Sequence, residues 1–245
     1  MSELTEKQIF NFIDLTSLNS TDSNKSITDL AEQTVKYHEN GYTAAAICVF
    51  PNFSDIVKEK LLGTPIKTAV VGACFPSSQS FLDTKILECK NAVKNGAEEV
   101  DIVLNLGAFF DENYDAVLNE IKTIKENIEP AKLKVILETG ELKENNLIKK
   151  AAEISIDGGA DFIKTSTGKV SIGATPEAVG VMADVVKAHF SKTNKFVGIK
   201  VSGGVKTKED AIRYYNIVQG KLGKEFMNNK FFRIGASSLA KHLMS

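Results

Sequence analysis

Three charged residues, Lys164, Lys200 and Asp101, lie in short apolar stretches that read as buried strands. Each of the two lysines ends its stretch, and a small polar loop that contains glycine follows. Burying an ammonium group costs several kcal/mol unless another group compensates its charge. Two lysines and an acid at matching places on separate strands therefore indicate a functional site.

The chemistry open to such a site is carbonyl chemistry. Two nearby ammonium groups disfavour each other's charge, and burial lowers a lysine pKa in the same direction. A neutral amine can attack a carbonyl carbon and form a Schiff base, and Asp101 could relay protons beside it. The simpler interpretation is a lysine whose head reaches water from a strand end and a salt-bridged acid with no role in turnover. Lys200 at the place equivalent to Lys164 favours the functional site.

The elements that must position these residues alternate along the whole chain. A short helix precedes the first strand, and we expect strands near 12–16, 44–50, 67–73, 98–104, 132–138, 161–164, 196–200 and 231–234, each followed by a helix. Such alternation implies parallel pairing. Eight units in 245 residues, with no Pro- or Ser-rich linker, favour one α/β domain, 1–245, folded as a (β/α)8 TIM barrel.

A weak internal repeat predicts which way the strand residues point. An Asn-Gly or Gly-Gly pair closes the helix before each of three strands, and the fifth residue after the pair is Ala46, Asp101 or Lys164. If these strands start in the same phase, the three side chains face the same way. We therefore expect Asp101 and Lys164 to point into the barrel near its C-terminal mouth, where barrel enzymes place their chemistry.

The loops after the sixth, seventh and eighth strands are rich in glycine, serine and lysine. Glycines let backbone N–H groups approach an anion, and a helix N-terminus adds a favourable dipole. Turn glycines and serine N-caps would explain either of the last two loops alone, but the pair occupies the recurring phosphate site of such barrels. The candidate phosphate-binding residues are Gly168, Lys169, Gly203, Gly204, Gly235, Ser237 and Ser238.

Composition excludes several other classes of protein. The formal net charge of -1 provides no basic field for nucleic acid. No apolar run approaches the roughly 20 residues needed to span a membrane, and the first residues lack a signal-peptide pattern, so we expect a cytoplasmic location. The three cysteines fit reduced thiols. The three histidines are scattered, so we expect neither a metal nor another cofactor.

With these residues assembled, the sequence resembles the deoxyribose-phosphate aldolases, a family of class I (Schiff-base) aldolases. The resemblance runs from about Asp14 to Leu239. Its most specific part is the long stretch around the sixth strand. The matching motifs lie at 99–101, 138–142, 160–168, 198–200 with 203–205, and 235–238.

This resemblance implies reversible cleavage of 2-deoxy-D-ribose 5-phosphate to D-glyceraldehyde 3-phosphate and acetaldehyde, a step of deoxyribonucleotide catabolism. It implies that Lys164 is the Schiff-base lysine, that Lys200 lowers its pKa, and that Asp101 belongs to the proton relay. The seven candidate phosphate-binding residues fall where the family holds the substrate phosphate. Members are cytoplasmic, need no metal and often form homodimers.

The sequence departs from the family pattern after Lys200, where Val201 and Ser202 replace a common Pro-Ala pair. Lys206 stands where arginine is common, which weakens bidentate phosphate contact. A tyrosine-ended tail found in some members has no counterpart at 241–245. Two alternatives stay open: a Schiff-base aldolase for another phosphorylated sugar, and a catalytically silent barrel that binds a phospho-sugar.

Overall fold

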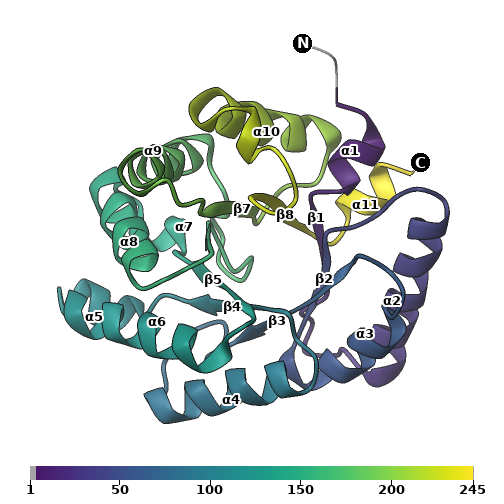
Figure 1. Cartoon of the computed structure of the whole chain (residues 1–245), viewed down its shortest axis with the longest axis horizontal. Coiled ribbons are helices and arrows are strands. Elements are labelled where there is room, and N and C mark those ends of the chain that lie inside the picture. Colours follow the sequence, from purple (N-terminus) through teal and green to yellow (C-terminus); the bar gives the residue numbers. More distant parts are fainter. Residues whose placement is uncertain (1–3, 245) are drawn as a thin grey trace.

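The chain forms a closed barrel of parallel strands with helices around it (Figure 1). The computed structural model describes residues 4–244. Each strand pairs with its neighbours in sequence, and the first strand also pairs with the last, which closes the barrel. The predicted (β/α)8 fold is confirmed. The strands are β1 (Ile13–Thr16), β2 (Ala46–Val49), β3 (Lys67–Gly72), β4 (Glu99–Val103), β5 (Lys132–Ile136), β6 (Phe162–Lys164), β7 (Gly198–Ser202) and β8 (Phe232–Ala236).

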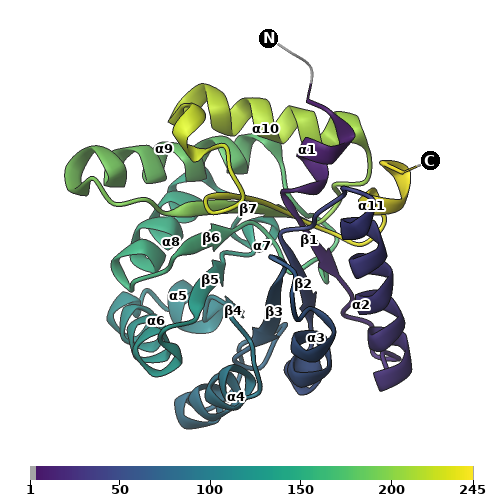
Figure 2. The same cartoon turned by 45° about the vertical axis from the view of Figure 1, so that its right-hand side comes forward.

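Helices cover the outside of the barrel. The longer ones are α2 (Asn24–Glu39), α3 (Ser54–Lys60), α4 (Leu82–Lys94), α6 (Tyr114–Ile128), α8 (Asn145–Asp157), α9 (Pro176–Thr193) and α10 (Lys208–Leu222). The short ones are α1 (Glu6–Phe10), α5 (Leu106–Phe110), α7 (Thr139–Leu142) and α11 (Leu239–His242), with 3-10 turns η1 (Pro51–Phe53) and η2 (Lys224–Phe226). Within residues 4–244, no helix is long and apolar enough to cross a membrane. The terminal helices α1 and α11 lie on the same side of the barrel in both views (Figure 2).

Local sequence signals set the ends of several helices. Ser23 and Thr207 accept hydrogen bonds from the first turns of α2 and α10 in capping boxes. Pro176 begins α9, where its missing N–H group costs nothing. Gly41 follows α2 with a φ of +84°, which a residue without a side chain adopts easily.

The barrel interior has an apolar part and a charged part. Buried apolar residues fill the layer between strands and helices, and a separate small cluster lies inside the barrel. That inner cluster consists of Leu18, Ala46, Cys48, Ala69 and Val71. Ala46 and Cys48 therefore face inward, as the phase of β2 predicted for Ala46. Charged side chains from β1 and from β4 to β8 occupy the remaining interior.

Some boundaries differ from those expected. β7 begins at Gly198 and extends to Ser202, beyond the predicted end at Lys200. A Cβ atom at Gly198 would lie 2.2 Å from the ring of Phe162, so only glycine fits beside β6 at this point. The short helices α5 and α7 were not expected, since five and four residues carry too little periodicity to reveal a helix.

Candidate active site

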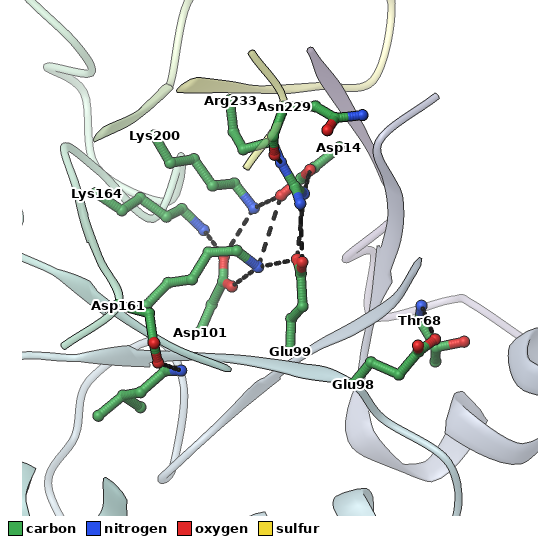
Figure 3. Close-up of polar contacts among 12 residues, drawn as sticks. Asp14, Thr68, Glu98, Glu99, Asp101, Asp161, Lys164, Lys200, Asn229 and Arg233 are labelled. Atoms are coloured by element: carbon green, nitrogen blue, oxygen red, sulfur yellow. Dashed lines mark hydrogen bonds and ion pairs between the residues drawn. The ribbon is translucent and has the colours of Figure 1, made fainter. Parts of the chain in front are cut away.

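Lys164 ends β6 inside the barrel with only 3% of its surface exposed. Its Nζ atom donates a hydrogen bond to Oδ2 of Asp101 on β4 at 2.8 Å. Lys200 on β7 is the register partner of Lys164, and its Nζ atom lies 2.8 Å from the same Oδ2 atom. Figure 3 shows both lysine side chains pointing at Asp101. The three residues identified from sequence as catalytic candidates therefore meet at one point.

A second layer of charges surrounds this meeting point. Asp14 on β1 lies 2.6 Å from Nζ of Lys200. Lys134 on β5 bridges Oδ1 of Asp101 at 2.9 Å and Oε2 of Glu99 at 2.6 Å. Arg233 on β8 donates to Glu99 at 2.8 Å and to Asp14 at 2.6 Å (Figure 3). All these side chains are buried, so each depends on its partners to offset the cost of leaving water.

The two lysines differ in their charge partners. Burial alone would lower the pKa of Lys200, but the carboxylates of Asp101 and Asp14 raise it above its ordinary value. Burial lowers the pKa of Lys164, and the charge of Lys200 acts in the same direction, which together outweigh the attraction of Asp101. Lys200 is therefore held as an ammonium group, whereas Lys164 gives up its proton more readily.

Asp101 remains a carboxylate in this environment. Burial would raise its pKa, but Lys134, Lys164 and Lys200 hold the pKa well below its ordinary value. Its two oxygens accept from all three ammonium nitrogens. The carboxylate is therefore placed to accept a proton from one lysine and donate it to another.

Lys164 opens onto a cavity of about 290 Å³ at the barrel mouth. The loops after β1, β6, β7 and β8 form its other walls. Ser202 and Lys206, two residues that depart from the family pattern, line it as well. A larger groove of about 810 Å³ lies between α8 and α9 on the outside of the barrel and holds none of these residues. All the candidate phosphate-binding residues line the mouth cavity, namely Gly168, Lys169, Gly203, Gly204, Gly235, Ser237 and Ser238.

Two successive glycines shape the loop after β7. Gly203 and Gly204 have φ angles of +83° and +92°, a region that residues with a side chain rarely adopt. A Cβ atom on Gly203 would lie 2.8 Å from the Cα atom of Gly173. The glycine pair therefore lets the loops after β6 and β7 pass close together at the edge of the cavity.

A buried acid supports the loop after β6. Glu138 accepts hydrogen bonds from the backbone N–H of Thr167 at 3.1 Å and from its hydroxyl. The Thr167 hydroxyl oxygen in turn accepts from the backbone N–H of Lys169 at 3.0 Å. The Lys169 ammonium reaches across the mouth to the carbonyl oxygen of Leu18 at 2.5 Å. Glu138 therefore lies beneath the loop and orders it.

Sequence reasoning missed three members of the charged cluster, Glu99, Lys134 and Arg233. Lys134 and Arg233 interrupt apolar strands with a charged side chain, and Glu99 begins one, which is the kind of signal that drew attention to Lys164 and Asp101. Glu99 also shares the parity of Asp101, two positions further on. Asp14, which ends the first predicted strand and is a weaker sequence candidate for this polar network, does belong to the cluster.

Metal ligands and disulfides play no visible part in the described region. Within residues 4–244, no group of three or more His, Cys, Asp or Glu side chains is arranged to hold a metal ion. Cys48, Cys74 and Cys89 are free thiols.

The closed barrel, with buried lysines beside a glycine- and serine-lined mouth cavity, places the chain among the (β/α)8-barrel enzymes. The sequence model of the DeoC/LacD family of aldolases matches residues 9–238. The chain belongs to this family of aldolases, and its reaction class is that of a carbon–carbon lyase.

Individual relatives agree with this assignment. A Caenorhabditis elegans protein, provisionally named a deoxyribose-phosphate aldolase, is 39% identical over 238 residues, which cover 95% of this chain and 78% of that protein. The crystal structure of a Coccidioides immitis protein with the same provisional name superposes with a TM-score of 0.84 at 27% identity, over 100% of this chain and 89% of that one. The aldolase QR15 superposes with a TM-score of 0.79 at 33% identity, over 96% of both chains.

Proposed function

We propose that this aldolase cleaves 2-deoxy-D-ribose 5-phosphate reversibly to D-glyceraldehyde 3-phosphate and acetaldehyde, through a Schiff base on Lys164. The observation that carries the proposal is the position of the Lys164 amine. It is buried, it shares its carboxylate partner with a second lysine, and it opens onto a cavity lined by glycine and serine loops. The names of the relatives supply the substrate.

The reaction begins at the open-chain aldehyde of the substrate. The neutral amine of Lys164 attacks C1, and loss of water leaves an iminium ion. A base removes the proton of the C3 hydroxyl, the C2–C3 bond breaks, and D-glyceraldehyde 3-phosphate leaves. The electron pair of that bond moves toward the iminium nitrogen, which forms an enamine. Protonation at C2 and hydrolysis of the new iminium ion release acetaldehyde and return Lys164.

Asp101 and Lys200 are suited to move the protons of these steps. Lys200 carries the proton, since two carboxylates hold it as an ammonium group. Asp101 joins Lys200 to Lys164 through a single oxygen atom. Asp101 accepts the proton taken from the C3 hydroxyl, and Lys200 gives a proton to C2 of the enamine. Asp101 then passes its proton to Lys200 and returns to a carboxylate, so the pair acts as acid and base in turn.

The two ends of the substrate have different chemistry, and so do the two sides of the mouth. The phosphate fits the side formed by the loops after β6, β7 and β8, where Lys169 and Lys206 supply positive charge. The two-carbon acetaldehyde unit fits the inner end of the cavity at Lys164, beside the inner apolar cluster that holds Cys48. This division supports a small aldehyde donor joined to a phosphorylated acceptor.

Imine trapping tests the proposal. The protein is incubated with acetaldehyde, reduced with borohydride, digested and mapped by mass spectrometry. We expect one added ethyl group on Lys164, and none there in a folded Lys164→Met variant. Label on Lys200 instead would mean that the roles of the two lysines are exchanged. A folded protein with no label on either would favour a phospho-sugar-binding barrel without catalysis.

Substrate comparison separates the remaining alternative, an aldolase for another phosphorylated sugar. Cleavage rates measured with 2-deoxy-D-ribose 5-phosphate and with other sugar phosphates should be highest for the first. A preferred sugar other than 2-deoxyribose 5-phosphate would leave the Schiff base in place and overturn the assigned substrate. The cytoplasmic location and the homodimer expected from the family resemblance stay predictions, to be checked by fractionation and by light scattering.

A further inference from the structure

Six buried charged side chains inside the barrel form a closed ring in which acids and bases alternate. We call this set the charge ring. Within this set of six, each carboxylate contacts two cations and each cation contacts two carboxylates at 2.6 to 2.9 Å. In order around the ring, the members are Asp101, Lys134, Glu99, Arg233, Asp14 and Lys200.

The charge ring is electrically balanced without Lys164. Its three carboxylates offset its three cations, and every member is buried. Lys164 is attached from outside the ring, through the Oδ2 atom of Asp101 that Lys200 also uses. As an ammonium group it would be a fourth cation with no carboxylate of its own. Since an uncompensated buried charge is costly, the balance of the ring favours the neutral amine.

We infer that Glu99 and Arg233 are positioning residues that keep the charge ring neutral and thereby keep the Lys164 amine free of its proton. Both residues act on Lys164 through Asp101. Glu99 reaches Asp101 through Lys134. Arg233 reaches it through Asp14 and Lys200. The inference rests on the proposed function, in which Lys164 is the nucleophile.

The ionisable groups that face Lys164 agree with this reading. Among residues 4–244, Lys164 forms its ion pair with the carboxylate of Asp101, and Lys200 opposes its charge. Cys48 on β2 and Glu138 after β5 are the other ionisable neighbours. Burial raises the pKa of the Cys48 thiol, so Cys48 supplies no negative charge near neutral pH. Burial likewise raises the pKa of Glu138, whose carboxyl oxygens accept from Thr167.

Paired substitutions can test the balance of charge directly. Glu99→Gln removes a negative charge and leaves the charge ring positive, so Lys164 should lose its proton at a lower pH. Arg233→Gln leaves the ring negative, so Lys164 should keep its proton to a higher pH. The double variant Glu99→Gln/Arg233→Gln is balanced again. Arg233→Lys keeps the charge while changing the geometry.

The readout is the rate at which acetaldehyde and cyanoborohydride label Lys164, measured by peptide mass spectrometry between pH ~5 and ~10. The labelling rate should rise with pH as Lys164 loses its proton, and we call this rising part of the profile the acid limb. We expect the acid limb to move by about one pH unit in opposite directions in the two single variants, roughly a tenfold change in rate at a given pH on that limb. In the double variant the acid limb should lie at the same pH as in the unaltered chain, and in Arg233→Lys it should lie close to that pH.

A merely structural role predicts a different pattern. Both single variants would then label more slowly, the double variant more slowly still, and the limb would not move in opposite directions. That result in folded variants would overturn the inference. If Arg233→Gln fails to fold, Glu99→Gln and the double variant decide, because the first must shift and the second must not. No label on Lys164 in the unaltered chain would overturn the proposed function and the inference together, whereas labelling with unmoved limbs would overturn the inference alone.

Discussion

Lys164 and Lys200 donate to the same oxygen atom, Oδ2 of Asp101, each at 2.8 Å. Only Lys200 has a second carboxylate, Asp14, at 2.6 Å. Two lysines on neighbouring strands, in register with each other, therefore have opposite pKa shifts. The difference lies in what each lysine touches besides Asp101, and on the proposed mechanism it gives them different roles.

Replacing Lys200 by leucine should move the activity to higher pH. The Lys200→Leu variant loses a positive charge beside Lys164 and leaves more of the negative charge of Asp101 to it, so the pKa of Lys164 rises. We expect kcat/KM at pH ~7 to fall by about 10- to 100-fold, with part of the loss recovered at higher pH. A kcat/KM profile against pH measures this. Lys187→Leu, a change of an exposed lysine on α9, is the matched control. An unchanged profile in Lys200→Leu would contradict the role given to Lys200.

Replacing Asp101 by asparagine should separate Schiff-base formation from turnover. The Asp101→Asn variant removes the attraction that opposes proton loss from Lys164, so the amine stays neutral and can still form an imine. The path that joins Lys200 to Lys164 is lost. We expect kcat for cleavage to fall by roughly 10²- to 10⁴-fold while borohydride still traps label on Lys164. Asp184→Asn changes a surface acid paired with Lys221 and should leave kcat unaltered. Full turnover by Asp101→Asn would exclude Asp101 from proton transfer.

The charge of Lys169 should matter only for a phosphorylated substrate. Lys169→Met removes an ammonium group at the cavity while keeping the length of the side chain. We expect KM for 2-deoxy-D-ribose 5-phosphate to rise about tenfold, the worth of a charge-assisted hydrogen bond. The rate with unphosphorylated 2-deoxyribose should not change. Equal losses with both sugars would mean that Lys169 acts by holding the loop to Leu18 rather than by binding phosphate.

Two glycine-to-alanine changes should have opposite effects on stability. Gly203→Ala places a side chain at a φ of +83° and close to Gly173, so it should lower the free energy of unfolding by about 1–3 kcal/mol. Gly220→Ala lies within α10, where no atom stands within 4 Å of the new Cβ, and should raise that free energy by roughly 0.5–1 kcal/mol. Urea unfolding midpoints measure both. Equal effects in the two variants would show that the Gly203 backbone is not constrained as described.

Stability should fall steeply in acid. Although burial alone would raise them, the pKa values of Asp14, Glu99 and Asp101 lie below their ordinary values because of the cations in the charge ring. Lowered values in the folded state contribute stability that is present above the unfolded pKa of about 4 and is lost as the pH falls through the folded values. Urea midpoints should therefore be nearly constant between pH ~7 and ~5 and should drop below ~4. Glu99→Gln, which has one acid fewer, should show a shallower drop; an identical drop would contradict the contribution of Glu99.

Much of the fold could be predicted because glycine stops and apolar periods mark the eight strands and the longer helices between them. The same stops gave the phase that turned Asp101 and Lys164 inward, a prediction that their 2.8 Å contact confirms. Helices α5 and α7 escaped because each is about one turn long and is defined by loop geometry, such as the hydrogen bond from Ala108 to the Asn105 side chain.

The charge ring could not be predicted because its order depends on contacts across the barrel. Arg233 and Glu99 come from strands that are not neighbours, and the sequence of either strand does not indicate which residue it pairs with across the barrel. Sequence shows that a charged residue interrupts an apolar strand, but it does not show which opposite charge compensates it. For the same reason, only the structure shows that Lys164 is a fourth cation beside a ring whose charges already balance.

Arg233 lies on the last strand and Asp14 on the first, 219 positions apart, and their ion pair joins the two strands where the barrel closes. A chain that is still being made cannot contain the charge ring, since β8 emerges after everything else that builds it. Without the complete charge ring, Lys164 lacks the balance of charge that, on the inference above, keeps its amine free of its proton. On that inference, the full reactivity of the nucleophile depends on the last strand, and a chain without β8 should react with aldehydes more slowly.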